Sequence, residues 1–149
     1  MAYATLQSMI ERFTEAELRQ LSPLAGQAGQ IDTVRVQRAL DDASAEMNSY
    51  LAVRFTVPVM PASGGELPLL VKAACDIARE DLARSPSDAV VAAAKRAREW
   101  LKAVAKGSAS LGSGPEGDPE AVPEADGGGA MVAAPDRVFT DDSLAGYLR

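Results

Sequence analysis

The side chains that carry out most protein chemistry are scarce in this sequence. It contains no histidine, and Cys75 is its single cysteine. Without histidine there is no imidazole to act as a general base, to bind a metal or to activate a nucleophile. One cysteine can form neither an internal disulfide nor a thiolate zinc cluster, and it is compatible with a reducing cytosol. An enzyme would have to rely on Lys, Asp and Glu alone.

No motif indicates a catalytic, cofactor or metal site. The sequence has no Gly-rich phosphate loop, no Ser/His/Asp set and no metal-ligand spacing, and the glycine run 127–129 follows no strand and opens no helix. We therefore expect no catalytic residue, no cofactor and no metal, although an enzyme that uses only Lys, Asp or Glu is not excluded by these residues. Cys75 falls within a predicted helix, where a small buried hydrophobe is a more common role than a reactive thiol.

Charge divides the chain into two parts. Residues 1–106 contain 13 Lys and Arg and 13 Asp and Glu, whereas residues 107–149 contain 2 and 8, so the net charge of −6 belongs to the second part. The first part is long enough for one domain with a modest core. The second is rich in Gly, Pro and acid, and it is too poor in apolar side chains to fold on itself. No apolar run approaches the ~20 residues of a membrane span and no signal-peptide pattern is present, so we expect a soluble protein without membrane contact, intracellular when made.

Capping residues and helical periodicity predict the helices of the first part. Thr5 is placed to cap a brief helix, and Thr14 with Glu17 forms a capping box for another. Asp32 is placed to cap the longest helix, which we expect to be the spine of the fold. Its apolar residues recur with helical period: Val36, Leu40, Ala43, Met47, Tyr50 and Leu51.

The segment after this helix is predicted to be extended, because Pro58 and Pro61 disfavour helix at the residues before them. A helix over 67–84 follows, with Pro68 in its first turn, where a missing N–H is tolerated. Residues 85–88 (SPSD) then offer a cap at Ser85, a first-turn proline and an early acid for the last helix. The predicted fold class is all-α: a small bundle of about five helices with one long central helix, followed by an extended C-terminal arm that ends in a short helix.

The last predicted helix is basic in its second half, and two interpretations of that charge stay open. Its cations are Lys95, Arg96, Arg98, Lys102 and Lys106. A sequence-neutral contact with DNA is one interpretation, but aromatic residues are not interleaved with the cations and the first part as a whole is neutral. A solvated or partner-facing helix is the other, and we favour it. Trp100, on the same helix, is expected to fill the core or a groove.

The C-terminal arm ends in a cluster that is typical of a docking segment. We divide the chain into a helical body (1–106), a linker (107–136) and a docking hook (137–149). In the hook, Asp141 and Asp142 suit a helix N-terminus. A helix this short is unstable alone, so we expect it to fold against a partner surface; a frayed, unused terminus is the alternative. The predicted docking residues are Val138, Phe139, Leu144, Tyr147 and Leu148.

Four segments of the chain, taken in order, carry a family resemblance. They are residues 1–13 (MAYATLQSMIERF), 38–55 (RALDDASAEMNSYLAVRF, leading to Pro58), 70–79 (LVKAACDIAR) and 137–144 (RVFTDDSL). Together they resemble the Mu-like phage and prophage family of small head completion, or head-tail connector, proteins. Residues 112–134 match no motif of that family that we can name.

The resemblance implies a helical adaptor without enzymatic activity. It implies a ring of about twelve copies below the portal at the capsid vertex, with double-stranded DNA passing through without specific binding. The implied partners are other copies of the chain, the portal protein and a tail-side connector or stopper protein. The implied location is the neck of the virion, after synthesis in the host cytoplasm. In related adaptors the C-terminal arm reaches the portal, so the hook would dock there or on neighbouring subunits.

Two other functions remain as alternatives. The chain could be a small helical regulatory or scaffold protein whose acidic arm autoinhibits it or recruits a partner. A DNA-binding regulator is the weaker alternative, because no helix-turn-helix with a basic recognition helix is evident. The oligomeric state of the pure protein and its presence in virions separate these functions from a connector.

Overall fold

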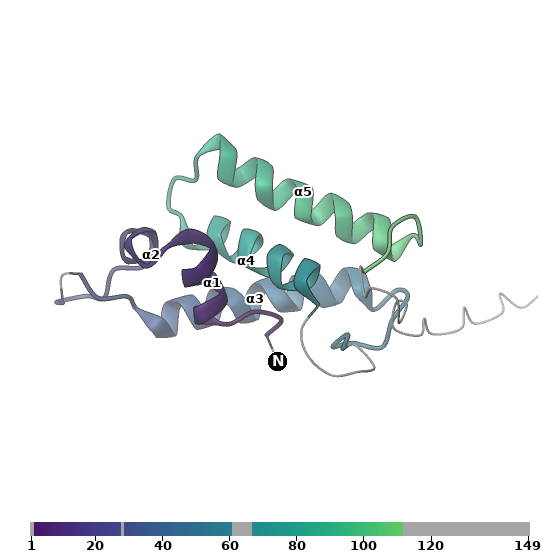
Figure 1. Ribbon diagram of the computed structural model, residues 1–149, viewed down its shortest axis with the longest axis horizontal. Helices are drawn as coiled ribbons and strands as arrows, with labels where there is room; N and C mark the ends of the chain where they lie inside the picture. Colours follow the sequence, from purple (N-terminus) through teal and green to yellow (C-terminus); the bar gives the residue numbers. More distant parts are fainter. Residues whose placement is uncertain (1, 28, 61–66, 112–149) are drawn as a thin grey trace, which may run out of the picture.

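A computed structural model describes residues 2–27, 29–60 and 67–111. They form five helices, α1 (Leu6–Phe13), α2 (Glu15–Leu21), α3 (Thr33–Leu51), α4 (Pro68–Leu82) and α5 (Asp88–Ala105) (Figure 1). In this part of the chain, β pairing is limited to an isolated bridge between Pro23 and Ile31. The all-α prediction is confirmed. None of the described helices is long and apolar enough to cross a membrane.

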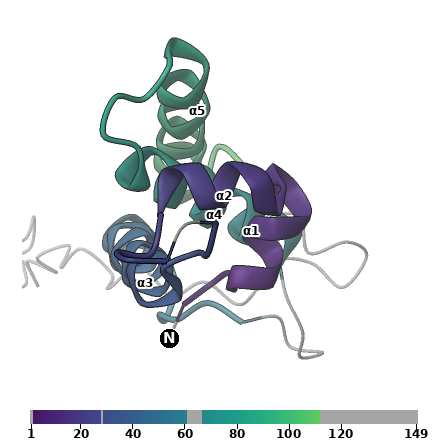
Figure 2. The ribbon, with the colours of Figure 1, turned by 90° about the vertical axis from the view of Figure 1, so that its left-hand side faces the viewer.

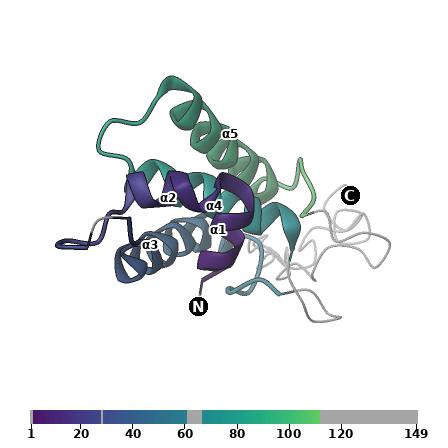
Figure 3. The ribbon, with the colours of Figure 1, turned by 60° about the vertical axis from the view of Figure 1, so that its left-hand side comes forward.

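Three long helices pack against one another and the two short helices cover one side of them. α4 contacts both α3 and α5, and these two also contact each other. Seen from the end, α5 lies above, α3 below and α4 between them, with α1 and α2 to one side (Figure 2). α1 crosses α3 and α4 and contacts both (Figure 3). The core therefore lies around α4, which is screened by three other helices.

The two short helices meet at Thr14, which serves both. Its N–H donates to the carbonyl of Ile10 at 3.0 Å and closes α1, while its hydroxyl accepts from the N–H of Glu17 at 3.4 Å and opens α2. The reciprocal half of the predicted capping box is wrong, because the Thr14 N–H is already used by α1. The Glu17 carboxylate instead accepts from Nε of Arg79 on α4 at 2.7 Å. This contact ties α2 to the central helix.

A complete capping box stands instead at the start of α1. The hydroxyl of Thr5 accepts from the N–H of Ser8 at 3.2 Å, and the N–H of Thr5 donates to the hydroxyl of Ser8 at 3.3 Å. The predicted cap at Thr5 is confirmed. Serine replaces the more usual Glu or Gln as the reciprocal partner, which is why the box was not recognised in the sequence.

α3 follows the prediction closely. A carboxylate oxygen of Asp32 accepts from the N–H of Arg35 at 3.0 Å, and the helix is the longest of the five, with 19 residues. The predicted stripe is buried, except for the half-buried Tyr50. Arg35 also donates to the carbonyl of Leu82 at 3.0 Å, which joins the start of α3 to the end of α4.

The loop after α3 is non-helical over 56–60, as predicted, and the N-terminal segment holds it in place. The Tyr3 hydroxyl accepts from the N–H of Val59 at 3.0 Å and donates to the side chain of Asn48 at 2.6 Å. Burial raises the pKa of this hydroxyl above 10.0, and the hydrogen bond from Val59 opposes that rise. Phe55 and Val59 are buried, so this loop contributes to the core.

α4 begins with Pro68 at its first positions, as predicted, and ends at Leu82. It is buried around most of its circumference, including Cys75, whose exposed fraction is 0%. That burial agrees with the interpretation of Cys75 as a small core residue. α5 begins at Asp88, with Ser87 at the N-cap and no side-chain cap bond. The predicted cap at Ser85 and first-turn Pro86 are wrong, because residues 83–87 are needed to reverse the chain direction between α4 and α5.

Candidate docking surfaces

The predicted docking hook lies outside the described residues. Its side chains Val138, Phe139, Leu144, Tyr147 and Leu148 therefore stay predictions, as does the division of the chain at residue 136. After residue 106 the chain still contacts the body, because the N–H of Ser108 donates to the carbonyl of Ala103 at 2.9 Å and Leu111 is buried in the core. The structure describes the surface of the body, on which another protein segment would have to dock. In the described part of the chain, no group of three or more Cys, Asp or Glu residues is placed to hold a metal ion.

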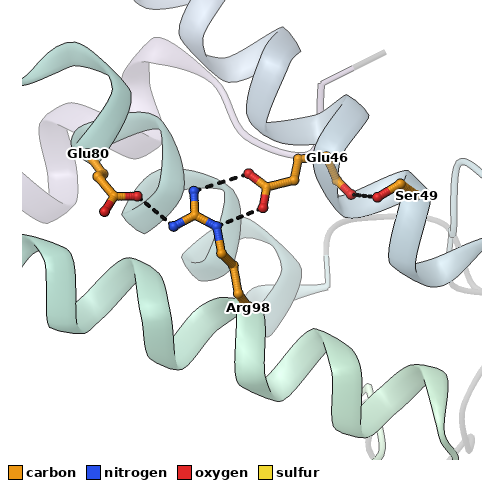
Figure 4. Close-up of polar contacts among 4 residues, drawn as sticks. All are labelled: Glu46, Ser49, Glu80 and Arg98. Atoms are coloured by element: carbon orange, nitrogen blue, oxygen red, sulfur yellow. Dashed lines mark hydrogen bonds and ion pairs between the residues drawn. The ribbon is translucent and has the colours of Figure 1, made fainter.

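One arginine joins the three long helices. Nε of Arg98 on α5 donates to the carboxylate of Glu46 on α3 at 2.7 Å, and Nη2 donates to the second oxygen of that carboxylate at 3.2 Å. Nη1 donates to Glu80 on α4 at 2.6 Å (Figure 4). The Arg98 side chain is 28% exposed. Its hydrogen bonds with Glu46, and then those with Glu80, raise the pKa of the guanidinium despite its partial burial.

This arrangement changes the role of a residue that the sequence placed in the basic helix. From the sequence, Arg98 is one of five cations expected to contact solvent, a protein partner or DNA. Its three hydrogen bonds to carboxylates instead hold α3, α4 and α5 together. Bidentate arginine–carboxylate pairs are among the stronger hydrogen-bonded pairs in proteins. Arg98 is therefore a structural residue of the body.

Asp81 lies in the electrostatic field of this cluster. Burial is the largest cause that raises the pKa of its carboxyl above 3.8, and the nearby carboxylates of Glu46, Glu80 and Asp42 raise it further. The positive charge of Arg98 opposes the rise. The acidic charge around Arg98 thus exceeds what one guanidinium neutralises.

The outer side of α5 has a different character. Four exposed cations remain there once Arg98 is set aside, and none forms an ion pair with a described residue: Lys95, Arg96, Lys102 and Lys106. Glu99 is the exposed acid among them. The outer side of α5 therefore carries a net positive charge, and Glu99 is not within ion-pair distance of these cations.

An apolar groove lies between α4 and α5 beside these cations. It has a volume of about 190 Å³ and a mainly apolar lining, formed by Leu69, Lys72, Ala73, Arg96, Ala97 and Trp100. Leu69 is 42% exposed and Trp100 is half-buried. The ammonium of Lys72 is paired with Asp76 at 2.8 Å, one turn further along α4. Trp100 thus forms part of a groove, one of the two roles expected for it.

Other exposed apolar side chains stand near the two ends of α3. Val34 in its first turn is 67% exposed and lies in a shallow hollow with Arg38 and Asp41. Val53, just beyond the end of the helix, is 75% exposed, and Met60 in the following loop is 55% exposed. Outside its apolar stripe, α3 is only partly free, because Arg35 and Glu46 are used in contacts with α4 and α5.

Apart from the Thr5–Ser8 capping box, the contacts missed by sequence reasoning join residues far apart in the chain. Arg98 binds partners 18 and 52 residues away, and Arg79 binds Glu17 from 62 residues away. Arg79 also lies over the ring of Phe13, 4.4 Å from its centroid. No periodic pattern reports such pairs, because helix periodicity relates residues three and four apart. The sequence does show glutamates and arginines on the helices that pack together. It does not show which glutamate pairs with which arginine.

Comparison with known proteins gives three matches. Residues 3–132 match the protein family described as Bacteriophage Mu, Gp36. The chain is 32% identical over 147 residues to the Mu-like prophage FluMu protein gp36 of Haemophilus influenzae, an alignment that covers 98% of both proteins. It is also 32% identical over 127 residues to gene product J of Escherichia phage Mu, covering 79% of this chain and 86% of that protein.

The matched ranges differ from those that carried the sequence resemblance. The family match includes residues 112–132, where no family motif was recognised, and ends before the hook at 137–149. The alignment with the Haemophilus influenzae protein leaves out about 2% of either chain, so it extends into the hook. The similarity therefore concerns the whole chain and not the helical body alone.

Proposed function

Because this chain belongs to the Bacteriophage Mu Gp36 family of Mu-like phage proteins, we propose that it is a structural head-tail connector. In this proposal it is an adaptor that forms a ring between the portal and the tail of a virion and gives passage to packaged DNA. The observation that carries the proposal is the 32% identity to a Mu-like prophage protein across 98% of both chains. The connector role is the one that the sequence resemblance implies.

The body has properties that a ring subunit needs. A closed ring is built from head-to-tail contacts, in which one face of a subunit meets a different face of its neighbour. Apart from Leu69 in the α4–α5 groove and Val91 in the first half of α5, the exposed large apolar side chains of the described residues stand at two separated places, Val34 at the start of α3 and Val53 with Met60 beyond its end. Neither place is a large apolar patch, which fits subunits that are monomeric or weakly associated until the portal organises them.

The hook supplies the second part of the proposal. Val138, Phe139, Leu144, Tyr147 and Leu148 dock on the portal or on neighbouring subunits when the connector assembles. Burying each large apolar side chain contributes about 1.5–3 kcal/mol, so several together offset much of the entropy lost when the segment is ordered. The linker supplies reach, because the 25 residues 112–136 that follow the buried Leu111 would span roughly 80–90 Å if fully extended.

DNA passes through this ring without being held. Each phosphate that a Lys or Arg neutralises strengthens a salt-dependent grip on DNA, which would oppose the movement of a genome. We therefore expect neutral or acidic side chains to line the passage. The unpaired cations of α5 then face a protein partner and not the DNA.

The test uses the phage or prophage that encodes this chain. Deletion of the gene is expected to leave DNA-filled heads that do not join tails, as seen by electron microscopy, and wild-type protein supplied in trans should restore joining. Mass spectrometry of purified virions should detect the chain. Normal joined particles after deletion, or absence of the chain from virions, would contradict the connector function.

A paired variant isolates the contribution of the hook. Phe139→Ala with Tyr147→Ala removes two of the proposed anchors, and particles should fill with DNA but fail to join tails or should leak. Met131→Ala with Val132→Ala removes a similar number of apolar side chains from the linker and should leave infectivity intact. Equal infectivity of the two double variants would show that the hook is dispensable.

The regulatory or scaffold alternative makes a different prediction. Such a protein would remain monomeric in the presence of the portal and would be missing from mature virions. Native mass spectrometry of the pure protein, alone and with the portal protein, distinguishes it from a connector, which should form a ring when the portal is present.

A further inference from the structure

The groove between α4 and α5 is an apolar surface that no described residue covers. Its floor is formed by the small side chains Ala73 and Ala97, and its walls include Leu69, 42% exposed, and the half-buried Trp100. Water contact with apolar surface of this kind is unfavourable. The groove holds about 190 Å³. A cavity of about 150 Å³ accommodates a benzene molecule, so the groove has room for one aromatic side chain.

The charges around the groove select the kind of segment that fits it. Arg96 lines the groove and forms no ion pair with a described residue, whereas Lys72 on the opposite wall is already paired with Asp76. Lys95, Lys102 and Lys106 add unpaired positive charge on the outer side of α5. The complementary occupant is a segment with an aromatic anchor and with acids close to that anchor in sequence.

The end of this chain has that composition. In residues 137–149 (RVFTDDSLAGYLR), Phe139 stands two and three positions before Asp141 and Asp142. The segment as a whole contains equal numbers of basic and acidic residues, since Arg137 and Arg149 match the two aspartates, and the other six acids of residues 107–149 precede it. The acids that can face Arg96 are therefore the adjacent pair Asp141 and Asp142, and the complementarity is local to that pair.

We propose that the groove between α4 and α5 binds the C-terminal segment 137–149 of the same molecule. Phe139 occupies the apolar cavity, and Asp141 and Asp142 lie beside Arg96. This assigns a binding surface on the body to the segment that the connector proposal directs to other proteins.

Chain length favours the same molecule over a second copy. The 25 residues 112–136 connect Leu111, the last described residue, to the segment. A random coil of that length has a root-mean-square span of about 25–30 Å. α5 has 18 residues and is about 27 Å long, so the segment can reach the groove. A short tether gives an effective concentration in the millimolar range, far above the concentration of the free protein in a typical experiment.

The proposal gives the body a way to keep the hook occupied before assembly. The same apolar residues cannot fill the groove and contact the portal at once, so the portal has to compete for them. This consequence rests on the proposed connector function, but the docking itself does not. Docking is measured on the isolated protein, and a negative result there would leave the phage experiments to decide the connector function separately.

The chain carries its own reporter for the test, because Trp100 is its single tryptophan and lines the groove. We would measure the quenching of Trp100 fluorescence by acrylamide in the full-length protein. Phe139→Ala is expected to make Trp100 more accessible to the quencher and to shift its emission to longer wavelength. Met131→Ala with Val132→Ala is the matched control and should change neither property.

Charge reversal tests the second half of the proposal. Arg96→Glu should expose Trp100 to the quencher as Phe139→Ala does, and adding Asp141→Arg and Asp142→Arg should restore protection. Arg96 is exposed, so the fold should tolerate the change, which circular dichroism and thermal unfolding would verify. Failure of the reversed acids to restore protection would contradict the assigned pairing.

Dilution distinguishes the same molecule from a second copy. Protection of Trp100 in the wild-type protein should be independent of protein concentration over a range in which the protein stays monomeric. Protection that is lost on dilution would assign the groove to another copy and overturn the proposal. Unchanged Trp100 accessibility after Phe139→Ala would overturn it as well.

Discussion

The two sides of the α4–α5 pair show how one helix serves both the fold and its surface. On the side toward α3, Arg98 is bound to Glu46 and Glu80, and the space between the helices is filled. On the other side, Arg96 has no ion pair with a described residue and an apolar groove is open. Side chains two residues apart on an α-helix point in directions that differ by about 200°. Arginines two residues apart therefore have opposite roles, one holding the body together and the other available to a partner.

The largest expected effect comes from removing an apolar side chain on each side. Leu101 on α5 is fully buried, whereas Leu69 on the groove wall is 42% exposed. Leu101→Ala should lower the free energy of unfolding by about 2–5 kcal/mol, because it removes buried apolar surface and leaves a cavity. Leu69→Ala should lower it by less than about 1 kcal/mol, because much of that side chain already contacts water. Urea unfolding of the two variants measures the difference.

This pair of variants also tests whether the groove is a surface or a part of the core. If Leu69→Ala destabilised the protein as strongly as Leu101→Ala, the groove would be filled by the body itself and the contrast between the two sides would be wrong. Leu101→Met, which nearly conserves the side-chain volume, is the control for Leu101 and should cost less than about 1.5 kcal/mol.

The second effect compares the two arginines. Arg98→Gln leaves the carboxylates of Glu46 and Glu80 without their shared partner in a half-buried site. We expect a loss of about 1–3 kcal/mol in the free energy of unfolding, since these bonds join charged groups and are partly screened by water. Arg96→Gln, the matched change on the groove side of α5, should alter the free energy of unfolding by less than about 0.5 kcal/mol. Chemical unfolding at neutral pH provides both values.

A double-mutant cycle separates the ion pair from the loss of the arginine itself. Glu46→Gln alone should destabilise the body, and adding it to Arg98→Gln should cost less than the sum of the two single effects. Strict additivity would show that Arg98 and Glu46 do not interact in solution. The packing of α5 against α3 would then depend on apolar contacts alone.

Most of the fold could be predicted because its signals are local. The caps at Thr5 and Asp32 and the apolar stripe of α3 lie within a few residues of the helix that each defines, and all are present. The errors are local as well. The N–H of Thr14 could donate either to the Glu17 side chain or to the carbonyl of Ile10 in α1, and it donates to Ile10. At Pro86 the chain needed a longer connection than the caps alone indicated.

The surfaces of the body could not be predicted in the same way. Five cations on one helix looked equivalent in the sequence, and the partition between Arg98 and the others depends on which way each side chain faces α3. The groove likewise depends on how α4 and α5 are placed side by side, since Leu69 and Trp100 are 31 positions apart by their residue numbers. The hook was recognised from its composition, and it lies outside the described residues.

The smallest expected effects are the stability changes caused by replacing two aspartates of α4, Asp81 and Asp76. These two changes should have opposite signs. Burial, together with neighbouring carboxylates, raises the pKa of Asp81 above 3.8, so the folded state disfavours its charged form. This penalty is absent at a pH below the pKa that Asp81 has in the unfolded chain. It appears as the pH rises through the higher pKa that Asp81 has in the folded protein. Asp81 is exposed to solvent, which screens this penalty, so Asp81→Asn should stabilise the protein at pH 7 by only about 0.5 kcal/mol or less and should have no effect near pH 3.

Asp76 on the same helix lies beside the groove and is paired with Lys72 at 2.8 Å. Asp76→Asn removes this ion pair, so it should destabilise the protein at pH 7 by about 0.2–1 kcal/mol. Thermal unfolding of both variants at pH 7 and at acid pH gives the signs directly. If Asp81→Asn destabilised the protein at pH 7, its carboxylate would be a needed partner of Arg98. The acidic charge around Arg98 would then not be in excess, and the contacts of Arg98 would depend on three carboxylates, those of Glu46, Glu80 and Asp81.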